Sequence, residues 1–83
     1  MARADDPLSI LVRAQLRSRL YRLGLLQNQL AARAGISQEY LSRILNGRQR
    51  VHVDLARALL AEVGLRLVVG VEDIEADNIE AGG

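Results

Sequence analysis

The 83-residue sequence predicts a small all-α domain, a compact bundle of four to five helices with a short β-strand at its carboxyl end. Three observations favour this class. Four successive segments repeat aliphatic residues at helical spacing, and each segment ends at a glycine. From residue 65 onward the spacing changes to two, which is typical of a strand. Hydrophobic residues make up 49% of the chain without any Phe, Trp or Cys, so the core must be aliphatic.

Caps and glycines define the first two predicted helices. Asp6 is a suitable N-cap for a helix beginning at Pro7, because proline favours the first helical position. This helix is expected over about 7–23, and a second over about 27–34 ends at Gly35, which can adopt a positive φ. Their expected buried residues are Leu8, Val12, Leu16, Leu20 and Leu23, then Leu30, Ala31 and Ala34.

The third and fourth predicted helices follow the same pattern. Ser37 is expected to cap a helix over about 38–45, which Asn46-Gly47 ends before a basic loop over 48–50. The fourth helix is expected over about 53–63 and stops at Gly64. The expected buried residues are Leu41, Ile44 and Leu45 in the third helix and Val53, Ala56, Leu59, Leu60 and Val63 in the fourth.

Residues 65–72 form the only segment with the alternation of a strand. A lone strand leaves its backbone groups unpaired, so the simplest arrangement is an antiparallel ribbon across the axis of a homodimer. The alternative is that the fourth helix continues through this segment. The expected dimer contacts are Leu65, Leu67, Val69 and Val71. The expected parts of the chain are a disordered amino terminus (1–6), a helical domain (7–64), a dimerisation strand (65–72) and an acidic flexible tail (73–83).

The net charge of +1 conceals an uneven distribution of charge along the chain. Residues 1–71 contain all eleven Arg and five acidic residues, whereas residues 72–83 contain five acidic residues and no base. A basic body followed by an acidic tail predicts a domain that binds a polyanion.

Few residues could carry catalysis or bind a metal. Without Cys there is no disulfide, thiolate metal site or Cys nucleophile. His52 is the only His and precedes the fourth helix, which favours a cap or surface role. Ser37, Ser42 and His52 lack a nucleophile elbow, so a hydrolase set is not favoured. No leader peptide or membrane segment is apparent. We therefore expect no enzyme, no metal and no cofactor, and a cytoplasmic location.

The outward face of the third predicted helix carries side chains suited to DNA. Two short helices joined by a glycine turn form the layout of a helix-turn-helix, whose second helix enters the major groove. Arg suits guanine, Gln suits adenine and Glu can accept from cytosine, while the start of the second helix and the basic loop suit phosphates. The residues expected at double-stranded DNA are Gln27, Gln38, Glu39, Tyr40, Ser42, Arg43, Asn46, Arg48 and Arg50.

The segment LLQNQLAARAGISQEYLSRILNGRQR, residues 25–50, resembles the lambda-repressor/Cro-like (XRE) helix-turn-helix family. The resemblance extends over about 16–64 and implies a bundle of about five helices. By analogy, it places Ser37 at DNA together with Gln27, Gln38, Glu39, Tyr40 and Arg43. Leu26 departs from the family, because a Thr or Ser cap is usual there, and the loop after Arg50 lacks the usual Pro. The matching residues are Gln27, Leu30-Ala31, Ala34-Gly35-Ile36-Ser37, Leu41-Ser42-Arg43-Ile44 and Asn46-Gly47-Arg48.

The resemblance implies a bacterial or phage-encoded transcriptional regulator, a repressor that binds an inverted-repeat operator as a homodimer. The LGLRLVV-type ending is similar to the HipB/HigA-like antitoxin branch, so one alternative is an antitoxin that binds a toxin protein and also represses its own operon. A second alternative is a protein-interaction module that retains the fold without DNA recognition. The acidic tail is expected to be solvated; toxin binding, or competition with DNA for the basic face, is the alternative.

Two of the expected DNA contacts have alternative roles. Tyr40 either contacts a thymine methyl or a phosphate, or only covers the surface of the first helix. Glu39 either accepts from a base or repels phosphates and so rejects wrong sequences.

Overall fold

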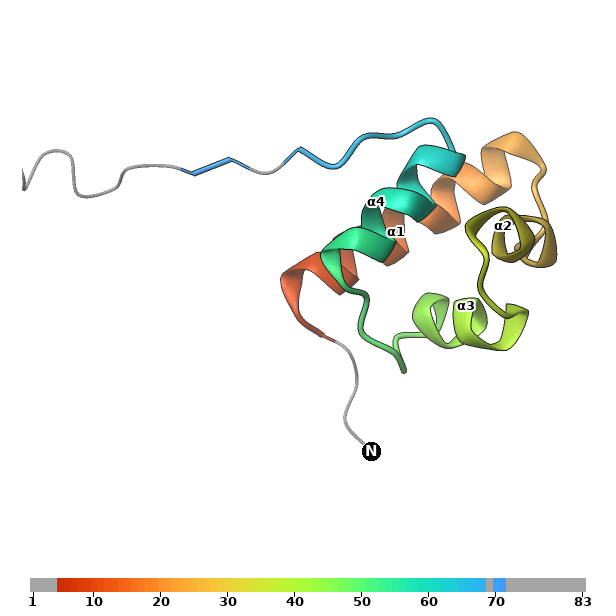
Figure 1. Ribbon diagram of the computed structural model, residues 1–83, viewed down its shortest axis with the longest axis horizontal. Coiled ribbons are helices and arrows are strands. Elements are labelled where there is room, and N and C mark those ends of the chain that lie inside the picture. Colours follow the sequence, from red (N-terminus) through yellow and green to blue (C-terminus); the bar gives the residue numbers. More distant parts are fainter. Residues whose placement is uncertain (1–4, 69, 72–83) are drawn as a thin grey trace, which may run out of the picture.

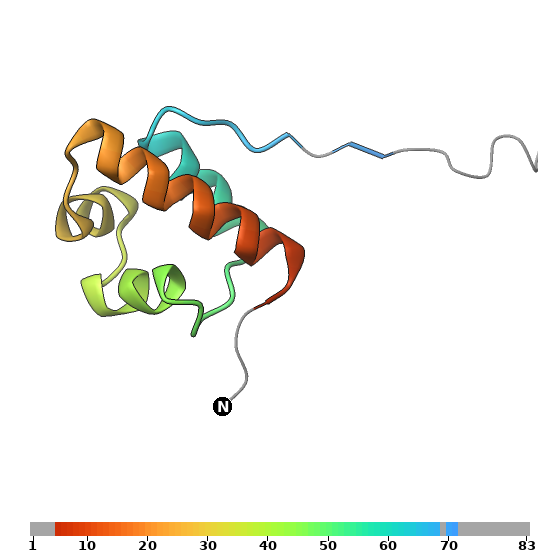
Figure 2. The same ribbon diagram turned by 180° about the vertical axis from the view of Figure 1, so that it is seen from behind.

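The computed structural model describes residues 5–68 and 70–71, which form four helices packed around one aliphatic core (Figures 1 and 2). Helices α1 (Pro7–Leu23) and α4 (Val53–Glu62) lie side by side. Helix α2 (Gln27–Ala34) packs against α4, α3 (Gln38–Leu45) packs against α1, and α2 and α3 pack against each other. The all-α prediction is confirmed, with four helices in the described part of the chain. The expected acidic tail, Val69 and most of the expected disordered amino terminus lie outside the described residues.

Local signals in the sequence account for the ends of the helices. The Asp6 carboxylate accepts a hydrogen bond from the backbone N–H of Ser9 at 3.1 Å, and Pro7 follows as the first helical residue. Gly24 and Gly35 end α1 and α2 with φ of 62° and 72°, a conformation that costs glycine little. As a result, the predicted bounds of α1, α2 and α3 agree with the structure, and α4 ends one residue earlier than predicted.

Helix α2 begins without a side-chain cap at its N-cap position. Leu26 holds the extended N-cap conformation, with φ −83° and ψ 154°, but has no side-chain acceptor. Gln29 provides a partial substitute, because its Oε1 accepts a hydrogen bond from the N–H of Leu26 at 2.8 Å. In a full capping box the side chain of the N-cap residue would also accept a hydrogen bond from the N–H of Gln29. Leucine at position 26 cannot accept it.

Replacing Leu26 with serine is therefore expected to stabilise the protein. Serine supplies the missing acceptor, and the leucine side chain is 61% exposed and contributes little burial. We expect the free energy of unfolding to rise by about 0.5–1 kcal/mol. Urea unfolding followed by circular dichroism measures this, with Leu26→Ala as the control that removes the leucine without adding an acceptor. Equal free energies of unfolding for the two variants would show that the missing cap acceptor does not limit the stability of the protein.

The core joins all four helices. Most of the residues expected inside are buried, and Leu8 and Ala34 are partly buried at its edge. Two expectations are wrong: Leu23 is 56% exposed and Val53 is 42% exposed. Each stands in the terminal turn of its helix, where a nearby loop residue packs instead. The fully or nearly fully buried residues are Val12, Leu16, Leu20, Leu30, Ala31, Leu41, Ile44, Leu45, Val51, Ala56, Leu59, Leu60 and Val63.

The replacement residues are in the adjoining loops. Leu25, just after the turn at Gly24, packs against the core near the end of α1. Val51 is buried two residues before Val53, and its backbone N–H donates to the hydroxyl of Ser9, which is itself buried. Helical spacing predicts which way a side chain points, but whether a side chain at the end of a helix is buried depends on the neighbouring loop.

The segment after α4 is not helical, so the alternative in which α4 continues is wrong. The helix ends at Glu62, and Gly64 follows with φ 78°. Leu65 and Leu67 are partly buried against the core, whereas Arg66 and Val68 are exposed, which preserves the predicted alternation. No strand is assigned to residues 65–68 or 70–71 of this single chain. Pairing of this segment across a dimer stays a prediction.

Two contacts attach the loop between α3 and α4 to the start of α1. The N–H of Val51 donates to Ser9 Oγ at 3.1 Å. One residue earlier, Arg50 Nε lies 3.4 Å from Asp6 Oδ1. Hydrogen bonds from the side chain and backbone of Ser9 lower the pKa of Asp6, and the charge of Arg50 lowers it further. Asp6 thus both caps α1 and holds the basic loop.

Because the pKa of Asp6 is lower in the folded protein, the ionised carboxylate contributes stability at pH values above its ordinary pKa of 3.8. This contribution is lost as the pH falls through the lowered pKa. Asparagine caps a helix equally well but does not titrate, so Asp6→Asn isolates the charge. We expect the difference in Tm between the wild type and this variant to shrink as the pH falls below 3.8. Thermal unfolding between pH 2 and 6 tests this; a difference independent of pH would contradict it.

Candidate nucleic-acid interface

The two short helices α2 and α3 and the glycine turn between them form the centre of the candidate interface. Helix α3 buries Leu41, Ile44 and Leu45, which fixes the rotation of the helix about its own axis. Its opposite face is left outward, with Gln38, Glu39, Arg43 and Asn46 all exposed. The core thus determines which side chains of α3 face the surroundings.

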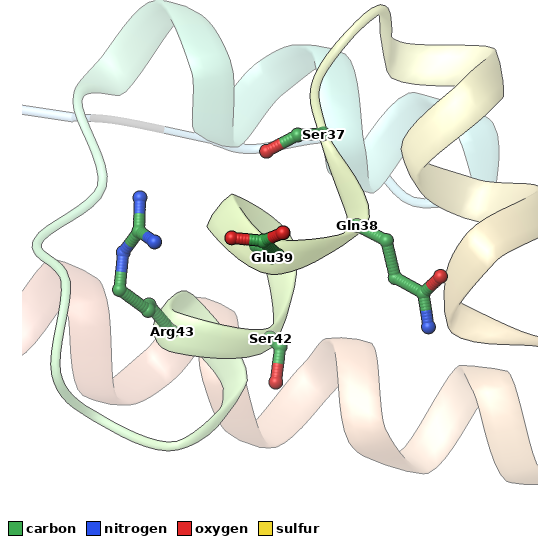
Figure 3. A pocket seen from close by; sticks show the side chains of 5 residues that line it. All are labelled: Ser37, Gln38, Glu39, Ser42 and Arg43. Carbon is green, nitrogen blue, oxygen red and sulfur yellow. The ribbon is translucent and has the colours of Figure 1, made fainter.

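Five of the predicted residues line one open hollow on this face: Ser37, Gln38, Glu39, Ser42 and Arg43. Figure 3 shows the Glu39 carboxylate between the side chains of Gln38 and Arg43, which extend to opposite sides of the helix. This face of α3 therefore presents a carboxylate, an amide and a guanidinium, which together offer hydrogen-bond acceptors and donors along the helix. This combination can distinguish base edges in a major groove.

Ser37 caps the amino end of α3. Its Oγ accepts a hydrogen bond from the N–H of Tyr40 at 3.0 Å, so the hydroxyl hydrogen points elsewhere and can be donated. The first backbone N–H groups of a helix lack partners within the helix and attract anions. This end of α3 therefore suits a phosphate oxygen, although the negative charge of Glu39 opposes the approach of phosphate close to its own side chain.

Arg43 stacks on the ring of Tyr40. The guanidinium carbon lies 5.5 Å from the ring centroid, within the range of a cation–π contact. The ring is partly buried against the core, so Tyr40 covers part of the core and also restrains Arg43. A restrained side chain loses less conformational freedom when it binds, which favours a specific contact by Arg43.

The remaining predicted residues lie outside this hollow. Gln27, the first residue of α2, is exposed and lines a second hollow together with Arg17 and Tyr21. Arg48 is exposed in the loop that follows α3. Arg50 is in the same loop, but its guanidinium pairs with Asp6, which neutralises part of its charge. The structure therefore gives one compact polar face on α3, with the other predicted residues at separate positions around it.

Sequence reasoning missed Arg17. From α1, its Nε and Nη2 donate to the carbonyl oxygen of Leu45 at 3.0 and 2.7 Å, and Nη2 also donates to Asn46 Oδ1 at 3.3 Å. The cation here satisfies the last carbonyl of α3, that of Leu45, and complements the negative end of the helix dipole. Asn46 in turn donates from Nδ2 to Ser42 Oγ at 3.3 Å. No local pattern predicts a contact between residues 28 positions apart.

No set of three or more His, Asp or Glu side chains in the described part of the chain is grouped to hold a metal ion. Among these same residues, no helix is long and apolar enough to cross a membrane.

Two short helices joined by a glycine turn, the second with a buried apolar face and an outward polar one, define the helix-turn-helix class of DNA-binding domain. A family model described as helix-turn-helix matches residues 16–69, more than half of the chain. The chain belongs to this family, which has the lambda-repressor/Cro-like architecture, and it is a DNA-binding transcription regulator. Comparisons with curated proteins and with solved structures gave no match.

Proposed function

We propose that the protein represses transcription by binding, as a homodimer, to an inverted-repeat operator in double-stranded DNA, in the cytoplasm of its host. The observation that carries the proposal is the outward face of α3, where Gln38, Glu39 and Arg43 are exposed on a helix that the core holds in place. A repressor needs no further chemistry, because occupation of a promoter by a tightly bound protein is sufficient.

Positive charge supports the proposal. All eleven cationic side chains, every one an arginine, lie within residues 1–71. Contacts between arginine and phosphate release counterions, so binding should weaken steeply as the salt concentration rises. Ser37 and Gln27, at the amino ends of α3 and α2, are suited to phosphates on either side of the groove. These contacts would orient α3, while base recognition would come from its outward side chains.

The proposed dimer uses the segment that follows α4. Val68 is 82% exposed and Val71 is 100% exposed, although valine favours burial in a sheet. An antiparallel copy of the same segment would pair the backbone groups of both strands, and side chains of the neighbouring strand would cover part of Val71, one of the predicted dimer contacts. The same exposed segment is the surface that the second candidate, an antitoxin, would offer to a toxin protein as an additional partner. A module without DNA recognition is disfavoured by the accessible polar face of α3.

Selection of bound duplexes from a random DNA library tests the proposal. We expect a symmetric sequence whose half-sites lie roughly 10 base pairs apart, and a dimer mass by analytical ultracentrifugation at concentrations that saturate the site. A salt titration on the selected duplex should give a steep negative slope. Weak binding that does not depend on sequence would contradict the repressor. A monomer that binds a single half-site would contradict the dimer.

A further inference from the structure

A chain of hydrogen bonds runs from α1 to the outward side of α3. Arg17 Nη2 donates to Asn46 Oδ1 at 3.3 Å, and Asn46 Nδ2 donates to Ser42 Oγ at 3.3 Å. Arg17 also holds the carbonyl oxygen of Leu45 with two of its nitrogens, which restrains the guanidinium at this position. Ser42 in turn lines the hollow beside Arg43.

The chemistry of these groups fixes the direction of every bond in the chain. A guanidinium has donors but no acceptor, so it must face the oxygen of the Asn46 amide and not its nitrogen. The amide nitrogen then faces Ser42, and the Ser42 oxygen must act as the acceptor of that bond. A hydroxyl that accepts in one direction keeps its own hydrogen for another partner. The arginine therefore determines, through the amide, that Ser42 is available as a donor.

We propose that Arg17 is a positioning residue that sets Ser42 to donate a hydrogen bond to an acceptor on the bound DNA. This inference rests on the proposed function. The acceptor is a phosphate oxygen or an acceptor on a base edge, such as guanine O6 or N7, adenine N7 or thymine O4. A group that can only donate, such as the cytosine amino group, could use the second lone pair of the Ser42 oxygen but would leave the Ser42 hydrogen without an acceptor, and is therefore disfavoured.

The role of Arg17 differs from that of an ordinary helix cap. Loss of a cap alone would weaken α3 and reduce binding to every duplex, whatever residue occupied position 42. Loss of positioning would instead remove the contribution of Ser42 in particular. A double-mutant cycle between Arg17 and Ser42 separates the two effects, since it measures whether one side chain acts through the other.

The first experiment uses the free protein and needs no DNA. NMR of the Asn46 side-chain amide in the full chain should show proximity of its hydrogens to Ser42, and Arg17→Met should abolish that proximity. The matched control is Arg57→Met, at an exposed arginine of α4, which should leave the proximity of the Asn46 amide to Ser42 unchanged. An Asn46 amide that keeps its orientation in Arg17→Met overturns the positioning role, whether or not the protein binds DNA.

The second experiment measures affinity for the selected duplex. Ser42→Ala should weaken binding roughly threefold to tenfold in the wild-type background, the size of one hydrogen bond, and by less than about twofold in the Arg17→Met background. An equal loss in both backgrounds overturns the inference, as does no loss in either. If the wild type binds no duplex, the proposed function and the donor role of Ser42 both fail, while the NMR experiment still decides the orientation of the amide.

Modified duplexes identify the acceptor. If Ser42 donates to a phosphate, one neutral methylphosphonate linkage should abolish the effect of Ser42→Ala without changing the preferred sequence. If it donates to a base, Ser42→Ala should relax the preference at one position of the selected sequence. Either result supports the donor role. The donor role is overturned if the wild type prefers, opposite Ser42, a group that only donates over a group that accepts.

Discussion

Replacing Leu41 with alanine is expected to lower the free energy of unfolding by about 2–5 kcal/mol. Leu41 is fully buried in the middle of α3, so its truncation leaves a cavity between this helix and the rest of the core. A domain of this size has a total stability of roughly 4–10 kcal/mol, so the loss is a large part of the whole. Thermal unfolding followed by circular dichroism should show a fall in Tm of roughly 10–30 °C.

Leu26→Ala is the matched control for this prediction. It removes the same atoms from a leucine that is 61% exposed, so we expect a change within about 0.5 kcal/mol. Similar losses at the two positions would mean that burial in the core does not govern stability here.

Removing the guanidinium of Arg43 is expected to cause the largest change in DNA recognition. If Arg43 contacts a guanine, Arg43→Ala should cost about 1–3 kcal/mol of binding free energy, and the preference at one base pair should disappear. The side chain is exposed, so the variant should unfold at nearly the wild-type temperature. Affinities for the selected duplex and for each single-base variant of it, measured by fluorescence anisotropy, give both quantities.

Arg57→Ala is the charge-matched control for Arg43→Ala. Arg57 is exposed on α4, outside the hollow on α3, and its loss should leave the sequence preference intact. If Arg43→Ala instead weakens binding equally on every duplex and reduces the salt dependence, Arg43 contacts a phosphate and base recognition lies elsewhere on α3.

The helices could be predicted from the sequence because their ends depend on local chemistry. Asp6, Ser37 and the glycines after α1 and α2 act on atoms a few residues away, and these positions can be recognised without a structure. The exposure of Leu23 and Val53 could not be predicted in the same way. Spacing assigned both to the core face, but a residue at the end of a helix is buried only if another element extends over it.

The exposed face of α3 was predictable to the same extent, whereas its contact with DNA stays a prediction. The outward residues of α3 followed from its apolar face, so Gln38, Glu39 and Arg43 were found where they were expected. The long-range contacts that hold the end of α3 and the loop after it were not predictable. The hydrogen bond of Arg17 to Leu45 and the ion pair of Arg50 with Asp6 join parts of the chain that are distant in sequence. Exposed arginines are common, and nothing local distinguishes the one that caps another helix.

The change of spacing after Gly64 was informative in part. It favoured an end of α4 near Gly64 but left a longer α4 as the alternative, which the structure rules out. The spacing could not determine what covers the apolar side chains of this segment. Within the described residues of one chain, no strand lies beside it. Leu65 and Leu67 use the core of their own chain, while Val68 and Val71 remain exposed.

The attachments of α3 have a consequence for how such proteins diversify. Ser37 holds the backbone N–H of Tyr40, and Arg17 holds the backbone carbonyl of Leu45, so both ends of the helix are secured through main-chain atoms. Main-chain atoms are the same whatever side chain they carry. Exchange of the outward residues at 38, 39 and 43 therefore leaves these bonds and the core unchanged. With these residues reading the bases, as proposed, a duplicated gene needs only a few substitutions at them to acquire a new target sequence, without a compensating change elsewhere in the fold.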